Sequence, residues 1–102
     1  MQLNDFQYPF FIGVAGTGMS AIAQYLSGTG KQVSGSDRYF TPGEANETRN
    51  KLEAEGIQCF LQDGSGITER TDLIVVSTAI EDTVAEVKKA REMGIPILKR
   101  SE

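Results

Sequence analysis

The chain has 102 residues, which suits a single domain with one modest core. Hydrophobic residues make up 39% and charged residues 24%, and the net charge of -4 without a basic cluster argues against nucleic-acid and anionic-membrane partners. Histidine is absent and Cys59 is the single cysteine, which excludes disulfides, Cys/His metal sites and histidine-based triads. No apolar run approaches membrane-spanning length and no secretory pattern opens the chain, so we expect a cytoplasmic protein.

Residues 1–9 form a lead-in to a domain that spans residues 10–102. Met1–Tyr8 is polar and without a pattern, so we expect this segment to be frayed. Pro9 suits the start of a strand because it lacks the N–H that a strand interior donates. The apolar run Phe10–Val14 then predicts a strand that is covered on both faces, as in parallel sheets.

A glycine-rich turn follows this strand, with glycines at positions 13, 16 and 18. An apolar stripe of helical period then predicts a helix over about Gly18–Ser27. A strand, a tight glycine turn and a helix N-terminus in this order form an anion site, because the first helical N–H groups have no internal partner. The spacing G-x-x-G-x-G differs from the dinucleotide fingerprint G-x-G-x-x-G, so we interpret the turn first as a phosphate cradle.

The segment Gly28-Thr29-Gly30-Lys31 superficially resembles the end of an ATP-binding P-loop. That pattern requires Gly where this chain has Tyr25, and Ser or Thr where it has Gln32. It also requires a preceding strand, whereas this segment follows a helix. We therefore interpret the segment as a helix C-cap and expect no ATP site in this chain.

A short strand over Gln32–Ser36 ends at Asp37. This aspartate lies nineteen residues beyond Gly18, where an acidic residue of a nucleotide-binding βαβ unit can accept hydrogen bonds from a ribose or base. The alternative is a solvated loop aspartate. The glycine turn before the strand favours the nucleotide-binding role.

The middle of the chain predicts an exposed helix and a third strand. Thr41-Pro42-Gly43-Glu44 carries helix-start signals, and the helix should extend to about Glu55. The strand follows at Gln58–Leu61, with Cys59 expected to fill the core. Asp63-Gly64-Ser65-Gly66 has the composition of a turn.

The most strand-like run of the chain is Leu73–Val76, which is followed by Ser77-Thr78-Ala79-Ile80. Hydroxyl residues at the carboxyl end of a central parallel strand lie where open α/β sheets bind ligands, although strand-end and helix-cap polarity explains them equally. A helix over about Thr83–Met93 and a strand at Ile95–Leu98 complete the chain, and Pro96 indicates a sheet edge.

The order of these elements, β-α-β-α-β-β-α-β, predicts an α/β fold. We expect a Rossmann-like three-layer domain with a five-stranded parallel sheet in the strand order 3-2-1-4-5. The glycine turn then lies where the strand order reverses, between the first and fourth strands. Ligands of open α/β sheets bind at this position.

Four segments, FIGVAGTGMSAIAQYL, VSGSD, VVSTAI and IPILKRSE, together resemble the N-terminal domain of the Mur ligases, in particular the alanine-adding ligases of peptidoglycan synthesis. The resemblance covers residues 10–102. It implies a domain that binds the UDP part of a UDP-N-acetylmuramate-type substrate. It also implies a longer chain, with a central ATPase domain that uses ATP and Mg²⁺ and a C-terminal domain that binds the incoming amino acid. On that basis the 102 residues should bind substrate without catalysing the reaction.

The resemblance also assigns roles to residues at the carboxyl edge of the sheet. One group would cradle the diphosphate, a second would face the ribose or uracil, and a third would form the opposite wall of the crevice. These groups are Ala15, Gly16, Thr17, Gly18, Met19 and Ser20; then Ser36, Asp37 and Arg38; and lastly Ser77, Thr78, Ala79 and Ile80.

The chain departs from the alanine-adding pattern at several positions. Ala15 replaces a typical Gly, Asp63 a typical His and Val84-Ala85 a typical Asn-Pro, and the loop Arg38–Gly43 is longer than usual. These departures leave open which UDP-sugar and which amino acid are used. The oligomeric state is also open.

Two other functions are compatible with the same elements. One is a nicotinamide-nucleotide-binding regulatory domain, against which Met19-Ser20 and the STAI segment count. The other is a protein-interaction module whose glycine turn is purely structural. Under the favoured interpretation, the partners are a UDP-sugar and the remaining domains of the same chain.

Overall fold

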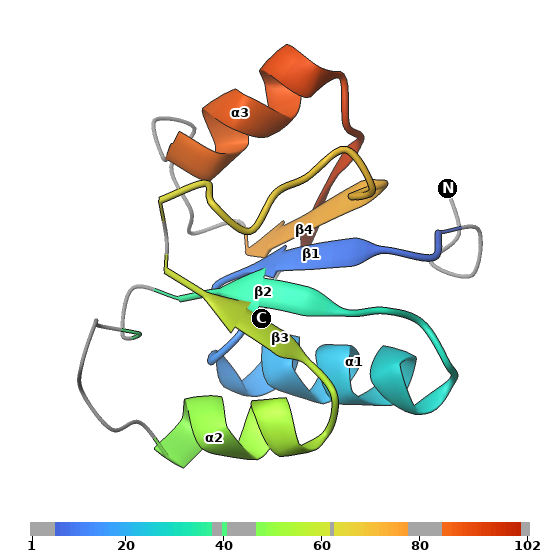
Figure 1. Ribbon diagram of the computed structural model, residues 1–102, viewed down its shortest axis with the longest axis vertical. Helices are drawn as coiled ribbons and strands as arrows, with labels where there is room; N and C mark the ends of the chain where they lie inside the picture. The colour runs from blue at the N-terminus through green and yellow to red at the C-terminus, as the bar shows by residue number, and fades with distance from the viewer. Residues whose placement is uncertain (1–5, 38–39, 41–46, 62, 78–84, 101–102) are drawn as a thin grey trace.

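The computed structural model describes residues 6–37, 40, 47–61, 63–77 and 85–100. All strand pairs are parallel, and the five strands form one sheet in the order 3-2-1-4-5, which confirms the predicted topology. Figure 1 shows α1 and α2 on one face of this sheet and α3 on the other, which gives the expected three layers. The elements are β1 (Pro9–Ile12), α1 (Thr17–Gly28), β2 (Ser34–Ser36), α2 (Glu47–Ala54), β3 (Gln58–Phe60), β4 (Leu73–Ser77), α3 (Ala85–Met93) and β5 (Ile97–Arg100).

The apolar side chains form two cores, one on each face of the sheet. Alternate residues of a strand point to opposite faces, so Phe11 of β1 packs on the α1 side while Phe10 and Ile12 pack on the α3 side. This explains why β1 and β4 are apolar at nearly every position. The α1-side core comprises Phe11, Val14, Met19, Ala23, Leu26, Val33, Phe40, Leu52, Ile57, Cys59, Leu73 and Val75. The α3-side core comprises Phe10, Ile12, Ile67, Ile74, Val76, Val87 and Ala90.

Residues just before β1 are held against the sheet rather than frayed. The backbone N–H groups of Gln7 and Tyr8 donate to the two carboxylate oxygens of Asp72 at 2.8 and 2.9 Å. The expected frayed lead-in is therefore wrong for Gln7 and Tyr8, because the Asp72 carboxylate satisfies their backbone donors. Residues 1–5 lie outside the described residues.

The last strand begins two residues later than predicted. The Ile95 N–H donates to Ala90 O at 2.9 Å and so belongs to the end of α3. Pro96 has no N–H to donate, but its carbonyl oxygen accepts from the Ile74 N–H at 2.9 Å. As Pro96 indicated, β5 lies at an edge of the sheet.

The predicted start of the second helix, residues 41–46, lies outside the described residues. α2 is described from Glu47, and it buries Leu52 as its contribution to the core. The longest described helix, α1, has 12 residues. Among the residues that the structure describes, no helix is long and apolar enough to cross a bilayer.

Candidate functional site

The glycine turn between β1 and α1 is fixed to the end of β2 by backbone hydrogen bonds. Gly13 has a φ of +86°, a conformation that glycine adopts without the strain of a side chain. The N–H groups of Gly13 and Val14 both donate to Ser36 O, at 2.8 and 3.0 Å. Gly16 N–H donates back to Gly13 O at 3.0 Å. The turn is therefore a rigid continuation of the sheet.

Asp37, the residue after β2, is part of this scaffold. Its Oδ2 accepts a hydrogen bond from Ala15 N–H at 3.0 Å, and the residue is 5% exposed. Asp37 is therefore not a solvated loop residue. A carboxylate acceptor forms a stronger hydrogen bond with the Ala15 N–H than a neutral acceptor would. The role toward a ribose or base stays a prediction.

The first turn of α1 leaves backbone donors for an anion. Gly16 is the N-cap, with φ −63° and ψ 147°, and it has no side chain to cap the helix. Ser20 N–H donates to Gly16 O at 2.8 Å, as a helical residue does. In the described part of the chain no acceptor takes the N–H of Gly18 or Met19. These groups point along the helix axis at its positive end, where an anion is stabilised.

These hydrogen bonds reduce the number of N–H groups that the predicted phosphate cradle can offer to a ligand. The N–H groups of Ala15, Gly16 and Ser20 already have internal acceptors, so they cannot also serve a phosphate fully. Gly18 is exposed, whereas the Met19 side chain lies in the core at 1% exposure. Met19 could therefore contribute its backbone, and Gly18 lies where a ligand would approach.

A buried hydrogen bond lies behind Ser36, and the sequence did not predict it. The Ser36 hydroxyl donates to Glu86 Oε1 of α3 at 2.7 Å, and both residues are 0% exposed. Glu86 Oε2 is buried and has no hydrogen-bond partner among the described residues. Burial, together with the nearby Asp63 carboxylate, raises the pKa of Glu86 to about 7, although the Ser36 hydrogen bond opposes this rise.

The burial of Glu86 in the third helix was not predicted. The buried side of α3 carries Glu86, Val87 and Ala90. Residues 86, 87 and 90 follow the i, i+1, i+4 spacing of one helix face. A glutamate within that spacing was the available signal of a buried carboxyl.

The remaining predicted site residues are only partly described. Arg38, Thr78, Ala79 and Ile80 lie outside the described residues. Ser77 ends β4 and pairs in register with Arg100 of β5. Thr17 is the first residue of α1. Across the ranges that the structure covers, no three His, Cys, Asp or Glu side chains gather as a metal site.

Asp63 lies in a turn, as its neighbours predicted. Its Oδ1 accepts from Ser65 N–H at 2.9 Å, and Gly64 has a φ of +89°. These hydrogen bonds from Ser65 lower the pKa of Asp63. The Asp63 side chain is exposed, but its negative charge raises the pKa of Glu86. This electrostatic effect links the turn to the carboxyl edge of the sheet.

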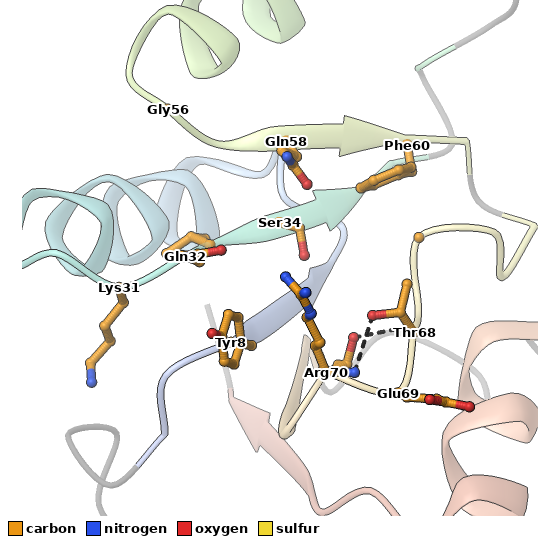
Figure 2. A pocket seen from close by; sticks show the side chains of 13 residues that line it. Tyr8, Lys31, Gln32, Ser34, Gly56, Gln58, Phe60, Thr68, Glu69 and Arg70 are labelled. Atoms are coloured by element: carbon orange, nitrogen blue, oxygen red, sulfur yellow. Dashed lines mark hydrogen bonds between the residues drawn. The ribbon is translucent and has the colours of Figure 1, made fainter.

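A pocket of about 740 Å³ opens elsewhere, over the α3-side face of β2 and β3. Much of its lining precedes a strand or begins one, so the pocket lies toward the amino ends of the strands. Figure 2 shows Arg70 extending toward Ser34, with Tyr8 beside it. The glycine turn lies at the carboxyl ends, where open α/β sheets bind ligands, so we place the candidate site there and not in this pocket.

Known sequences that are similar to this chain come from one enzyme family. A sequence model described as Mur ligase family, catalytic domain, matches residues 10–102. The chain is 41% identical over 92 residues to UDP-N-acetylmuramate–L-alanine ligase of Syntrophomonas wolfei, and 42% identical over 92 residues to the ligase of the same name from Mesorhizobium japonicum. These alignments cover 89% and 90% of this chain but 19% of each relative. The chain thus spans about one fifth of the length of these relatives.

Solved structures with the same fold come from the same group of enzymes. UDP-N-acetylmuramate-alanine ligase from Thermotoga maritima has a TM-score of 0.76 at 28% identity, covering 91% of this chain and 20% of that chain. UDP-N-acetylmuramate:L-alanyl-gamma-D-glutamyl-meso-diaminopimelate ligase from Neisseria meningitides has a TM-score of 0.75 at 25% identity, covering 92% and 28%. The sheet described above is therefore similar to one domain of much longer chains.

Proposed function

Because the chain belongs to the Mur ligase family, we propose that it binds the UDP moiety of a UDP-N-acetylmuramate-type substrate as the first domain of an ATP-dependent amino-acid ligase. The family match spans residues 10–102, which are nearly all of the chain. The relatives named above add L-alanine to UDP-N-acetylmuramate, as their names state. The parent enzyme would act in the synthesis of peptidoglycan precursors.

The observation that carries this proposal is the open first turn of α1. Gly18 and Met19 present backbone N–H groups that no acceptor in the described ranges takes, directly after a turn that Ser36 and Asp37 hold in place. A diphosphate is the matching ligand, because its oxygens can replace water on such donors. The chain has a net charge of -4, so backbone dipoles rather than a basic cluster would supply most of the attraction.

The other predicted contacts are part of the proposal. The backbone from Ala15 to Ser20 would surround the diphosphate, with direct hydrogen bonds from the N–H groups of Gly18 and Met19. Asp37 and Arg38 would lie beside the ribose or uracil. Ser36 would act through its hydrogen bonds to the turn, since its hydroxyl is already donated to Glu86. Residues 77–80 would form the opposite wall.

The chemical step would take place outside this chain. Family resemblance implies that ATP, with Mg²⁺ bound, would transfer its terminal phosphoryl group to the substrate carboxylate in a following central domain, leaving ADP and an acyl phosphate. The amine of the amino acid would then attack the acyl phosphate and displace phosphate. The sequence of this chain holds no P-loop, which such a transfer requires. The role of this domain would be to position the substrate's nucleotide end.

Calorimetric titration of the chain tests the proposal. We expect UDP-N-acetylmuramate and UDP to bind, uridine to bind more weakly because it lacks the diphosphate, and ATP to produce no specific heat. Binding of NAD⁺ without binding of UDP would overturn the proposal in favour of a nicotinamide-nucleotide domain. Failure of all these nucleotides to bind would favour an interaction module with a structural glycine turn.

A further inference from the structure

A continuous set of hydrogen bonds joins α3 to the glycine turn through the end of β2. Glu86 Oε1 accepts from the Ser36 hydroxyl at 2.7 Å. The carbonyl oxygen of the same serine accepts from Gly13 and Val14 N–H at 2.8 and 3.0 Å. The next residue, Asp37, accepts from Ala15 N–H. Any displacement of Ser36 is therefore transmitted to three consecutive amides of the turn.

The Glu86 carboxyl is poised between two protonation states. Its Oε2 is fully buried, and no residue in the described part of the chain forms a hydrogen bond with it. An ionised carboxylate with an unsatisfied buried oxygen is costly, whereas the neutral acid is less so. The ionised form, in turn, accepts a stronger hydrogen bond from the Ser36 hydroxyl than the neutral form does. A change of protonation therefore changes how firmly Ser36 is held.

The charged groups around Glu86 come from two elements. Asp63, in the turn that follows β3, places a negative charge near the carboxyl. Lys89, one turn along α3, donates to Gly64 O at 2.8 Å and acts on Asp63. On the β2 side the contact is the neutral Ser36 hydroxyl, with Asp37 as the next residue. Within the described residues, no cation is paired with Glu86 to hold it ionised.

We propose that Glu86 is a positioning residue of the UDP site, which acts through the Ser36 hydroxyl on the Gly13–Ala15 turn and couples its own protonation to phosphate binding. This inference rests on the proposed function. The neutral carboxyl favours the bound state, because it removes a buried negative charge from behind the site of a dianionic diphosphate. Substrate binding is then accompanied by proton uptake at Glu86.

The electrostatic environment supports this coupling. Burial and the Asp63 carboxylate raise the pKa of Glu86 to about 7, so both protonation states are populated near neutral pH. An exposed glutamate would be ionised throughout the neutral range and could not respond there. The coupling between protonation and binding therefore depends on the position of Glu86 in the core, beneath the end of β2.

Nuclear magnetic resonance on the 102-residue chain tests the coupling without any ligand. Between pH 5.5 and 8.5, the amide signals of Gly13, Val14 and Ala15 should shift with the midpoint of the Glu86 side-chain carboxyl. In Glu86→Gln these shifts should vanish. In Ser36→Ala the carboxyl should still titrate while the turn amides no longer follow it. Turn amides that stay still in the wild type, or that titrate equally in Glu86→Gln, would overturn the proposal.

A matched variant, Asp63→Asn, should shift the pH midpoint of the amide titration instead of abolishing the titration. Asp63→Asn removes a negative charge that raises the pKa of Glu86, while its side-chain oxygen can still accept from Ser65. The turn amides should then titrate at lower pH than in the wild type. An unchanged midpoint for these amides, with a lowered midpoint for the Glu86 carboxyl, would show that the turn follows another group and would overturn the proposal.

Titration with UDP-N-acetylmuramate separates this inference from the proposed function. Its diphosphate is esterified at both ends and keeps its charge across this pH range. Wild-type affinity should fall roughly threefold to tenfold between pH 6 and 8, and Glu86→Gln should keep the affinity measured at pH 6. An equal pH dependence in Glu86→Gln would overturn the coupling. If the wild type binds at no pH, the proposed function fails, and the amide titration alone decides whether Glu86 controls the turn.

Discussion

The Oδ2 atom of Asp37 accepts a hydrogen bond from the backbone N–H of Ala15 at 3.0 Å, across 22 positions of sequence. The acidic residue after β2 is thereby built into the glycine turn itself. Ser36 O also accepts hydrogen bonds from the N–H groups of Gly13 and Val14. Ser36 at the end of β2 and the following Asp37 thus orient three amides of the turn. The turn's shape is set by the neighbouring strand as much as by its own glycines.

Asp37→Ala should reduce both stability and UDP binding. It leaves the Ala15 N–H without its acceptor, so we expect the free energy of unfolding to fall by about 1–3 kcal/mol and UDP binding to weaken by a similar amount. Urea unfolding and calorimetric titration measure the two effects. Asp37→Asn, which keeps an acceptor oxygen, should recover most of the stability. Unchanged stability and affinity in Asp37→Ala would show that this hydrogen bond does not maintain the turn.

Gly35→Ala should destabilise the fold at the contact between β2 and the glycine turn. A Cβ at this position would lie 2.7 Å from Val14 Cβ and 2.8 Å from Phe11 O. We expect a loss of about 1–3 kcal/mol in the free energy of unfolding, because backbone cannot move aside cheaply. Gly28→Ala is the matched control, since no atom of the described residues lies within 4 Å of its Cβ, and it should be neutral or slightly stabilising. Equal stability in the two variants would contradict this packing.

Much of the fold could be predicted because two periodicities are strong in the sequence. Phe10–Ile12 and Leu73–Val76 are apolar at each position, which identifies central strands that pack on both faces. Met19, Ala23 and Leu26 repeat at helical spacing and are all buried. Gly56 and Gly94 follow α2 and α3 with positive φ, as glycines at helix C-termini commonly do.

The hydrogen bonds of the site could not be predicted, because they join residues far apart in sequence. Ser36 and Glu86 lie 50 positions apart, and a Glu in a helix is normally assigned to the exposed face. The anchoring of Gln7 and Tyr8 by Asp72 spans a similar separation. Glycine spacing predicted a phosphate cradle, but only the tertiary pairings show which N–H groups of the turn remain available.

Cys59 should be inert in the folded protein. The thiol lies in β3 at 6% exposure, and burial, aided by Glu53 and opposed by Arg49, raises its pKa to about 11. The reactive thiolate is therefore scarce at pH 8. We expect iodoacetamide to modify the folded chain at least ~100-fold more slowly than the urea-unfolded chain, followed by mass spectrometry. Rates within a few-fold of each other would place the thiol at the surface.

Glu86 should make stability fall as the pH rises. The folded state binds the Glu86 proton more tightly than the unfolded chain, whose ordinary pKa is 4.5. Its contribution is therefore complete below pH 4.5, is lost progressively up to about pH 7 and changes no further above that. The shift corresponds to about 3 kcal/mol of stability.

The difference in unfolding free energy between wild type and Glu86→Gln isolates this contribution, because the other titrating groups are common to both. Urea unfolding at pH 5, 6, 7 and 8 should show the wild type losing stability relative to the variant up to pH 7. A difference that is constant from pH 5 to pH 8 would mean that Glu86 ionises in its ordinary range.

Gly18→Val should abolish UDP binding while leaving the domain folded. Gly18 is exposed and lies within the first turn of α1, where helical backbone has a negative φ that valine tolerates. The added side chain would stand where the diphosphate approaches the Gly18 and Met19 N–H groups, and valine is rigid at χ1, so it could not turn away freely. Gly28→Val, at the exposed other end of the same helix, is the control and should bind UDP normally. Thermal melting by circular dichroism together with UDP titration distinguishes the outcomes. A β-branched side chain at position 18 would block a diphosphate bound to these N–H groups. A folded Gly18→Val variant that binds UDP as tightly as the wild type would therefore place the phosphates elsewhere.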